Sequence, residues 1–418
     1  MIDNFFNKYS RASVIFADQA MVSGVNFLTG LLFARFLGIE EFGRFTLAWM
    51  VVLFVNSLQM ALVSSPMMAI GPKQEPKGIC FYYTSVMVQQ LIFGLLSFVF
   101  VFVFVKISDC IFPKWDIENI ALPLASVAFC FQNQDFFRRY FFTRDAFLQS
   151  LISDVISYLG QLILLVIMFW KTSMETSTVL WVITFTSALS IIFALWMLEE
   201  MKWSSKVFFV TIKRHWDFAK WIAASAILHW SSGNLFFIVT GNLLGIGAVG
   251  AMKASQNIMG VAHILFQGFE NIVPISASKA LHLGGKRAMF RYLGKVTLGG
   301  GVLLVCFSLI VALKPELWLT MLFGSEYQGY GNVLRWFSLI YLLMFLGFPL
   351  RSGLRALEYT RPIFLSYFLA TIFTISMSYF LIVRFELLGS MFGLFVVYCL
   401  LAMVPFWTLI NFAHIQDR

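Results

Sequence analysis

The sequence predicts an all-α protein that crosses a membrane many times. Hydrophobic residues make up 60% of the 418 residues, charged residues make up 12%, and the mean hydropathy is +0.82. A soluble domain carries about 25% charged residues, so this composition excludes one. The apolar segments are too long for transmembrane strands and lack period-2 alternation, which favours helices. The start of the chain, MIDNFFNKYSR, lacks a short apolar core with a cleavage site, so we expect no removable signal peptide.

Twelve segments are apolar enough and long enough to be membrane-spanning helices. They cover roughly 13–37, 43–69, 79–105, 119–141, 146–169, 177–198, 218–244, 248–276, 292–313, 330–355, 361–383 and 387–411. The fourth is interrupted by QNQDFFRR, and the eighth contains many polar residues. Both are still predicted to span.

The connecting loops alternate in charge. Of the 30 lysines and arginines, 21 fall on one side of the predicted membrane and seven on the other, while Lys253 and Arg335 fall within spans. The positive-inside rule places the basic side, with both termini, in the cytoplasm. Because the net charge of +9 is spread over these loops, it indicates topology and not a nucleic-acid partner.

The chain divides near its midpoint into two similar halves. With an offset of 207, Leu37, Gly38, Ile39 and Gly43 fall on Leu244, Gly245, Ile246 and Gly250. We therefore expect six-helix bundles over 1–198 and 218–418, joined by an amphipathic cytoplasmic linker at 199–217. Six spans are an even number, so the halves are parallel repeats related by a pseudo-twofold axis along the membrane normal, with a substrate site between them.

A polar stripe follows one face of the predicted eighth span. It consists of Lys253, Asn257, Gly260, His263, Gln267, Glu270 and Pro274, flanked by Gln256 and Asn271. A charge at the bilayer centre costs roughly 3 kcal/mol, and less where it lines a water-filled cavity. The stripe therefore favours a cavity-lining face over amides that only bond to neighbouring helices. His263 is either a titrating group or simply a hydrogen-bonding residue.

Other polar residues gather in the first two spans of each half. They include Asp18 and Asn26 in the first span and His229 and Asn234 in the seventh. Cations such as Lys253 and Arg335 suit an anionic substrate, although either side chain can instead reach the interface. Asp18 and Glu270 either bind a coupling cation or neutralise nearby basic side chains.

Two further patterns have plainer interpretations. Arg138, Arg139 and Arg144, with Asp135 one turn inside, either anchor the cytoplasmic end of the fourth span or attract anionic headgroups. The five cysteines show no CxxC and no nearby histidine at ligand spacing, so we expect neither a disulfide nor a metal site.

The first hairpin, LLFARFLGIEEFGRFTLAW at 31–49, resembles that of bacterial O-antigen-type polysaccharide flippases. These belong to the multidrug/oligosaccharidyl-lipid/polysaccharide exporter superfamily. Their pattern, A-R-x-L-G-P-E-x-[FY]-G, is matched by Ala34, Arg35, Leu37, Gly38, Glu40, Phe42 and Gly43, with Ile39 in place of proline.

The resemblance implies a V-shaped transporter of two bundles around a central cavity, in the bacterial inner membrane. It would move an undecaprenyl-diphosphate-linked oligosaccharide outward for O-antigen and lipopolysaccharide biosynthesis, driven by the membrane potential or by H⁺ or Na⁺ antiport. The implied partners are membrane lipids, a polysaccharide polymerase and a chain-length regulator. The rival interpretations are a cation-coupled multidrug antiporter and a membrane polymerase or ligase, although no large outer loop or nucleophile–base pair favours an enzyme.

The candidate residues form two groups, with no catalytic or metal-binding residue among them. The substrate-binding candidates are Lys253, Arg335, Asn257, Gln256, His263, Gln267, Asn26, Asn234 and Arg35. The ion-coupling candidates are Asp18 and Glu270.

Overall fold

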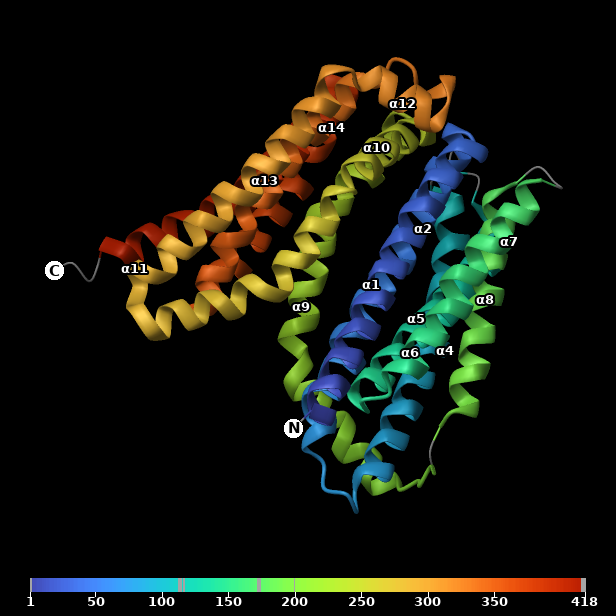
Figure 1. The fold of residues 1–418 in the computed structure, drawn as a ribbon. Helices are drawn as coiled ribbons and strands as arrows, with labels where there is room; N and C mark the ends of the chain where they lie inside the picture. Colours follow the sequence, from blue (N-terminus) through green and yellow to red (C-terminus); the bar gives the residue numbers. More distant parts are fainter. Residues whose placement is uncertain (1, 112–114, 116, 171–173, 199, 415–418) are drawn as a thin grey trace. The chain divides into compact units, whose positions relative to one another are not determined.

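The structure is a computed structural model, and every element in its described part is helical (Figure 1). It describes the backbone of residues 2–111, 115, 117–170, 174–198 and 200–414. Within these ranges, the side chains of 2–16, 109–110, 263–265, 267–268, 270–272 and 412–414 are not described.

The chain divides into two compact units. Unit 1 comprises Met1–Leu32 and Arg44–Ile227, and unit 2 comprises Phe33–Gly43 and Leu228–Arg418. The turn after the first predicted span therefore belongs to unit 2, although the helices on either side of it lie mostly in unit 1. Within the predicted linker, residues from Ser205 onward belong to one helix that continues into the seventh predicted span.

The helices of the first half begin with α1 (Ile2–Phe36) and α2 (Ile39–Gln59). There follow the π-helix η1 (Met60–Ser64), α3 (Ser65–Ile70), the 3₁₀ turn η2 (Gly71–Lys73), α4 (Ile79–Ile111), η4 (Glu118–Ile120), α5 (Ala121–Thr143), α6 (Phe147–Asp154), the π-helix η5 (Val155–Leu159), α7 (Gly160–Phe169) and α8 (Thr176–Trp196). In unit 1, α5 packs against both α4 and α8. The two π-helices interrupt predicted spans, and such segments are frequent at functional sites.

The second half consists of fewer, longer helices. They are α9 (Ser205–Leu243), α10 (Ile246–Met259), α11 (Ala262–Leu313), α12 (Pro315–Phe323), the 3₁₀ turn η6 (Ser325–Tyr327), α13 (Gly331–Ala356) and α14 (Arg361–His414). In unit 2, α13 packs against α11 and α14. Non-helical backbone at Gly284–Gly285 kinks α11, and at Glu386 it kinks α14. Both kinks fall between predicted spans.

The predicted eighth span comprises α10 and the start of α11. Gly260 and Val261, which lie between the two, keep φ and ψ in the right-handed helical region. The side chains of much of the stripe beyond them are not described, so the expectation that the stripe follows one face stays a prediction. Lys253 and Asn257 lie on α10, whereas the backbone of His263, Gln267 and Glu270 belongs to α11.

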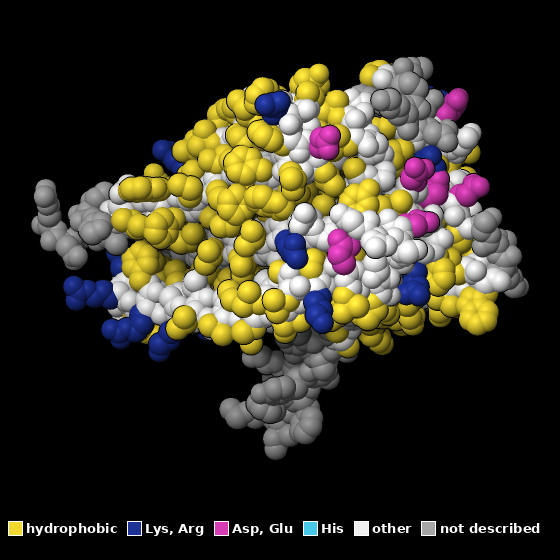
Figure 2. Space-filling model, turned by 90° about the horizontal axis from the view of Figure 1, so that it is seen from above, with side chains coloured by type: hydrophobic (Ala, Val, Ile, Leu, Met, Phe, Trp, Pro, Cys, Tyr) yellow, Lys and Arg dark blue, Asp and Glu magenta, His cyan; other side chains and the backbone are white. Residues whose placement is uncertain are grey.

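Eight helical stretches in the described part are long and apolar enough to cross a membrane. α1 and α5 are not among them, because polar residues lower their hydropathy, and α10 is not among them because it has only 14 residues. Large apolar side chains such as Leu96 and Ile375 are 65% and 66% exposed, and Figure 2 shows hydrophobic side chains over much of one face. A soluble monomer rarely exposes so much contiguous apolar surface, so this is a multi-pass membrane protein.

Candidate functional site

The turn between α1 and α2 is fastened to the α12–η6 segment within unit 2. The Tyr327 hydroxyl donates to the Ala34 carbonyl at 2.9 Å, and the backbone N–H of Ile39 donates to Glu326 Oε2 at 2.9 Å. Arg35 Nη1 donates to the Met321 carbonyl at 3.0 Å, near the C-terminus of α12. Burial raises the pKa of the Tyr327 hydroxyl above its ordinary value.

The motif that resembles the flippase pattern therefore has a structural use. Gly38 takes a φ of +80°, which favours glycine, and it places the Ile39 N–H against Glu326. The described contact of Arg35 stabilises a helix end, where a cation is favoured by the helix dipole. Its role in binding substrate stays a prediction.

Two equivalent glycines give the internal repeat a physical meaning. A Cβ on Gly43 would collide with the carbonyl oxygen of Ile246, and a Cβ on Gly250 would collide with that of Ile39. Gly43 corresponds to Gly250, and Ile39 corresponds to Ile246, at the same offset of 207. The two contacts are therefore reciprocal, as expected where two copies of one motif meet about a twofold axis.

Lys253 lies on α10 with its ammonium hydrogen-bonded to a neighbouring amide. Its Nζ donates to Gln256 Oε1 at 2.8 Å, and the Tyr341 hydroxyl donates to the Gln256 backbone carbonyl at 3.3 Å. A lysine ammonium has three donors, so this contact with Gln256 uses one of them. Asn257 is half-buried one turn further on. The arrangement can bind an anion or the hydroxyl groups of a sugar.

The other candidates of unit 2 are only partly described. The side chains of His263, Gln267 and Glu270 lie outside the described residues, so their roles stay predictions. Arg335 is exposed, and its Nε donates to the Ala312 carbonyl at 3.3 Å, near the end of α11. The Asn234 amide donates to the Trp230 carbonyl at 2.9 Å, within its own helix.

In unit 1, Asp18 belongs to a buried charge cluster that sequence reasoning did not assemble. Arg138 Nη2 lies 3.0 Å from Asp18 Oδ2, and Arg138 Nε lies 2.7 Å from Asp154 Oδ2. The Gln134 amide donates to Asp154 Oδ1 at 2.8 Å. Asp18 and Asp154 are 2% and 0% exposed, and the Arg138 side chain is 14% exposed. We call Asp18, Arg138, Asp154 and Gln134 the unit 1 charge cluster.

The cluster corrects one interpretation of the arginines. Arg138 is not a surface anchor, because its guanidinium lies between two buried carboxylates. Asp18 therefore neutralises a basic side chain, one of the two roles predicted for it. One guanidinium between two carboxylates leaves one formal negative charge. Asn26, the other candidate of the first span, is exposed.

The polar residues that interrupt the fourth span fill the interior of unit 1. The Gln59 amide donates to Gln90 Oε1 at 2.9 Å, and the Gln90 amide donates to Asn133 Oδ1 at 3.3 Å. Gln59, Gln90 and Asn133 are all buried. The stretch QNQDFFRR in the fourth predicted span therefore indicated such a network, because polar residues in a membrane helix must find partners inside the protein. Nothing in the sequence pointed to Asp154.

The fold of the chain is similar to that of solved transporters of the MOP superfamily. The chain is similar to a structure described as the inward-facing conformation of a multidrug resistance MATE family transporter of that superfamily (TM-score 0.71, 13% identity, 96% of each chain covered). It is also similar to the lipid II flippase MurJ in an inward closed conformation (TM-score 0.72, 13% identity, 96% of this chain and 87% of that one). A MOP superfamily transporter from Pyrococcus furiosus gives a TM-score of 0.57 at 13% identity, with 96% of each chain covered.

The family follows from the sequence itself. Residues 32–330 match the family described as "Polysaccharide biosynthesis protein", and the chain belongs to that family. No curated protein matches the chain significantly. This family match confirms the predicted resemblance to a polysaccharide family.

Proposed function

We propose that the protein is a flippase that moves an undecaprenyl-diphosphate-linked oligosaccharide from the inner to the outer leaflet by alternating access. The main support is membership of the polysaccharide biosynthesis family over residues 32–330, in a chain with the MOP transporter fold. MurJ, which shares the fold, is described as a flippase of another lipid-linked compound, lipid II. The O-antigen repeat unit is the substrate we expect.

The proposed topology has twelve spans in two six-helix bundles, with both termini in the cytoplasm of a bacterial cell. The twelve predicted segments fall on helical residues, and the kinks of α11 and α14 each divide a long helix between two of them. The distribution of lysine and arginine supports the orientation.

The proposed binding chemistry centres on Lys253. A diphosphate needs cationic donors, and oligosaccharide hydroxyls need amides such as those of Gln256 and Asn257. Arg335, His263 and Gln267 stay further candidates for binding the substrate.

The energy source has two candidates. Moving about two negative charges outward across 100 mV supplies roughly 4–5 kcal/mol. The competing source is antiport of H⁺ or Na⁺ through Asp18 or Glu270.

A multidrug antiporter is the second candidate function, and the similarity to a MATE transporter favours it. Export of cationic dyes from cells expressing the protein would support this alternative. Dye export by cells expressing the protein, together with normal oligosaccharide export in cells that lack it and any redundant flippase, would contradict the flippase proposal.

The sidedness of the lipid-linked oligosaccharide in cells tests the proposal. Attachment of the oligosaccharide by a ligase on the outer face reports its arrival there. The cells compared contain the native protein, no such protein, or the Lys253→Ala variant. Lys206→Ala is the matched control, because Lys206 is an exposed lysine near the start of α9. We expect the intermediate to be trapped inside without the protein and in Lys253→Ala, but not in Lys206→Ala. Normal export without the protein, in cells lacking a redundant flippase, would contradict the function. Normal export in Lys253→Ala, with export still lost in cells without the protein, would exclude Lys253 as a substrate-binding residue.

A further inference from the structure

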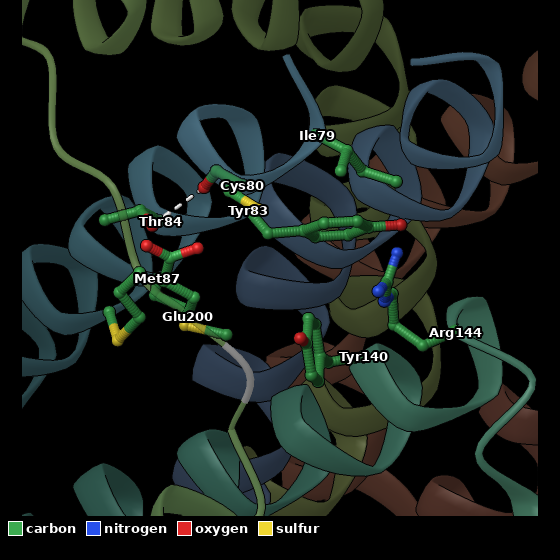
Figure 3. A pocket seen from close by; sticks show the side chains of 9 residues that line it. Ile79, Cys80, Tyr83, Thr84, Met87, Tyr140, Arg144 and Glu200 are labelled. Atoms are coloured by element: carbon green, nitrogen blue, oxygen red, sulfur yellow. Dashed lines mark hydrogen bonds between the residues drawn. The ribbon is translucent and has the colours of Figure 1, made fainter. Parts of the chain in front are cut away.

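Unit 1 contains a pocket that the proposed transport does not use. It lies between the start of α4, the end of α5 and the segment just before α9, and it holds about 270 Å³ of empty space including its open mouth (Figure 3). The lining residues are Ile79, Cys80, Tyr83, Thr84, Met87, Tyr140, Arg144, Glu200 and Met201.

The walls of the pocket are fixed by packing and hydrogen bonds. Thr84 Oγ1 accepts the backbone N–H of Lys202 at 3.1 Å, which holds the segment before α9 against α4. The rings of Tyr83 and Tyr140 meet edge to face at 5.2 Å. The tyrosine hydroxyl of Tyr83 points towards Gly71, where a Cβ would lie 2.6 Å from it. The pocket is therefore built into the fold of unit 1.

The pocket combines a cation with apolar walls. Arg144 stacks its guanidinium over the Tyr83 ring at 5.4 Å, which orients the group. Figure 3 shows Arg144 and Tyr140 beside Tyr83, with Glu200 across the space. Glu200 forms an ion pair with Lys202 at 3.2 Å, which neutralises the one carboxylate of the lining. Arginine is well suited to phosphate, and the apolar walls suit an aliphatic chain.

The surroundings place this pocket at the level of lipid headgroups. The exposed side chains of neighbouring α9 include Lys206, Lys213 and Lys220 together with Trp216 and Trp221. Tryptophan and lysine side by side are typical of the membrane–water interface. The charge distribution assigns this end of the unit to the cytoplasmic side, where anionic lipids attract basic segments.

We propose that this pocket binds the phosphodiester headgroup of an anionic glycerophospholipid from the inner leaflet, with Arg144 contacting the phosphate. The site is separate from Lys253 and does not depend on which compound the protein transports. It would attach the α4–α5 end of unit 1 to the leaflet surface.

Native mass spectrometry of the full chain in detergent micelles tests this binding. The probes are phosphatidylglycerol, phosphatidylcholine, undecaprenyl phosphate and inorganic phosphate. We expect phosphatidylglycerol to bind at least tenfold more tightly than phosphatidylcholine. Arg144→Gln should weaken phosphatidylglycerol binding at least tenfold, whereas Lys206→Gln, an exposed control outside the lining, should weaken it less than twofold.

A second variant keeps the test decisive if Arg144→Gln does not fold. Glu200→Lys changes an exposed lining residue, and it should strengthen phosphatidylglycerol binding several-fold by adding a cation. Equal losses in Arg144→Gln and Lys206→Gln, or no gain in Glu200→Lys, would overturn the site. Displacement of the lipid by millimolar phosphate, or tighter binding of undecaprenyl phosphate, would overturn the assignment to a glycerophospholipid.

Discussion

Replacing Arg138 with glutamine should destabilise unit 1 more than any other single change in the unit 1 charge cluster. The substitution leaves Asp18 and Asp154, which are 2% and 0% exposed, without their shared cation. Removing one partner of a buried ion pair costs about 3–5 kcal/mol. Asp18→Asn should cost less, about 1.5–3 kcal/mol, because it removes one charged hydrogen bond while Asp154 still neutralises Arg138.

The assay is denaturant titration of the purified protein in micelles, followed by circular dichroism. Lys106→Gln is the matched control, because Lys106 pairs with Glu118 and both side chains are exposed, at 45% and 59%. That change should have little effect on stability. The double variant Asp18→Asn/Arg138→Gln should be more stable than the sum of its two single changes predicts, by about 1–3 kcal/mol. A loss in Arg138→Gln no larger than in Lys106→Gln would refute the reasoning.

Three further predictions follow from unit 2. Gly43→Ala and Gly250→Ala should each destabilise the protein by about 1–3 kcal/mol in the same titration, because the new methyl group meets a backbone carbonyl. The control Gly24→Ala should not destabilise the protein, because the space around Gly24 is open. Tyr327→Phe should cost about 1–3 kcal/mol, because it leaves the buried Ala34 carbonyl without its donor; an unchanged midpoint would show that the contact contributes nothing. Lys253→Met should reduce oligosaccharide export at least tenfold in the ligase assay, while Lys253→Arg should retain most of it. Equal export by the two variants would show that export does not need the positive charge at this position.

The helices were largely predictable from the sequence, because membrane spans are set by local hydropathy and length. The kink at Glu386 falls in the gap left between the predicted segments 361–383 and 387–411.

The partners of the charged residues were not predictable, because they depend on tertiary packing. Arg138 lies 120 residues from Asp18 in the sequence, and Arg35 lies 286 residues from Met321. The interrupted span indicated buried polar residues near Arg138 but could not name Asp154. The repeat at Gly43 and Gly250 was visible in the sequence, yet only the structure shows that each glycine packs against the other copy.

Reconstitution of the purified protein into liposomes tests the central claim of outward transport most directly. The vesicles would carry undecaprenyl-diphosphate-linked oligosaccharide in the inner leaflet, with a lectin outside to detect its arrival. We predict lectin binding that depends on the native protein, persists in Lys206→Ala and falls at least tenfold in Lys253→Ala. Lectin binding equal to that of protein-free vesicles, by a folded native protein under both a membrane potential and an ion gradient, would contradict the flippase function.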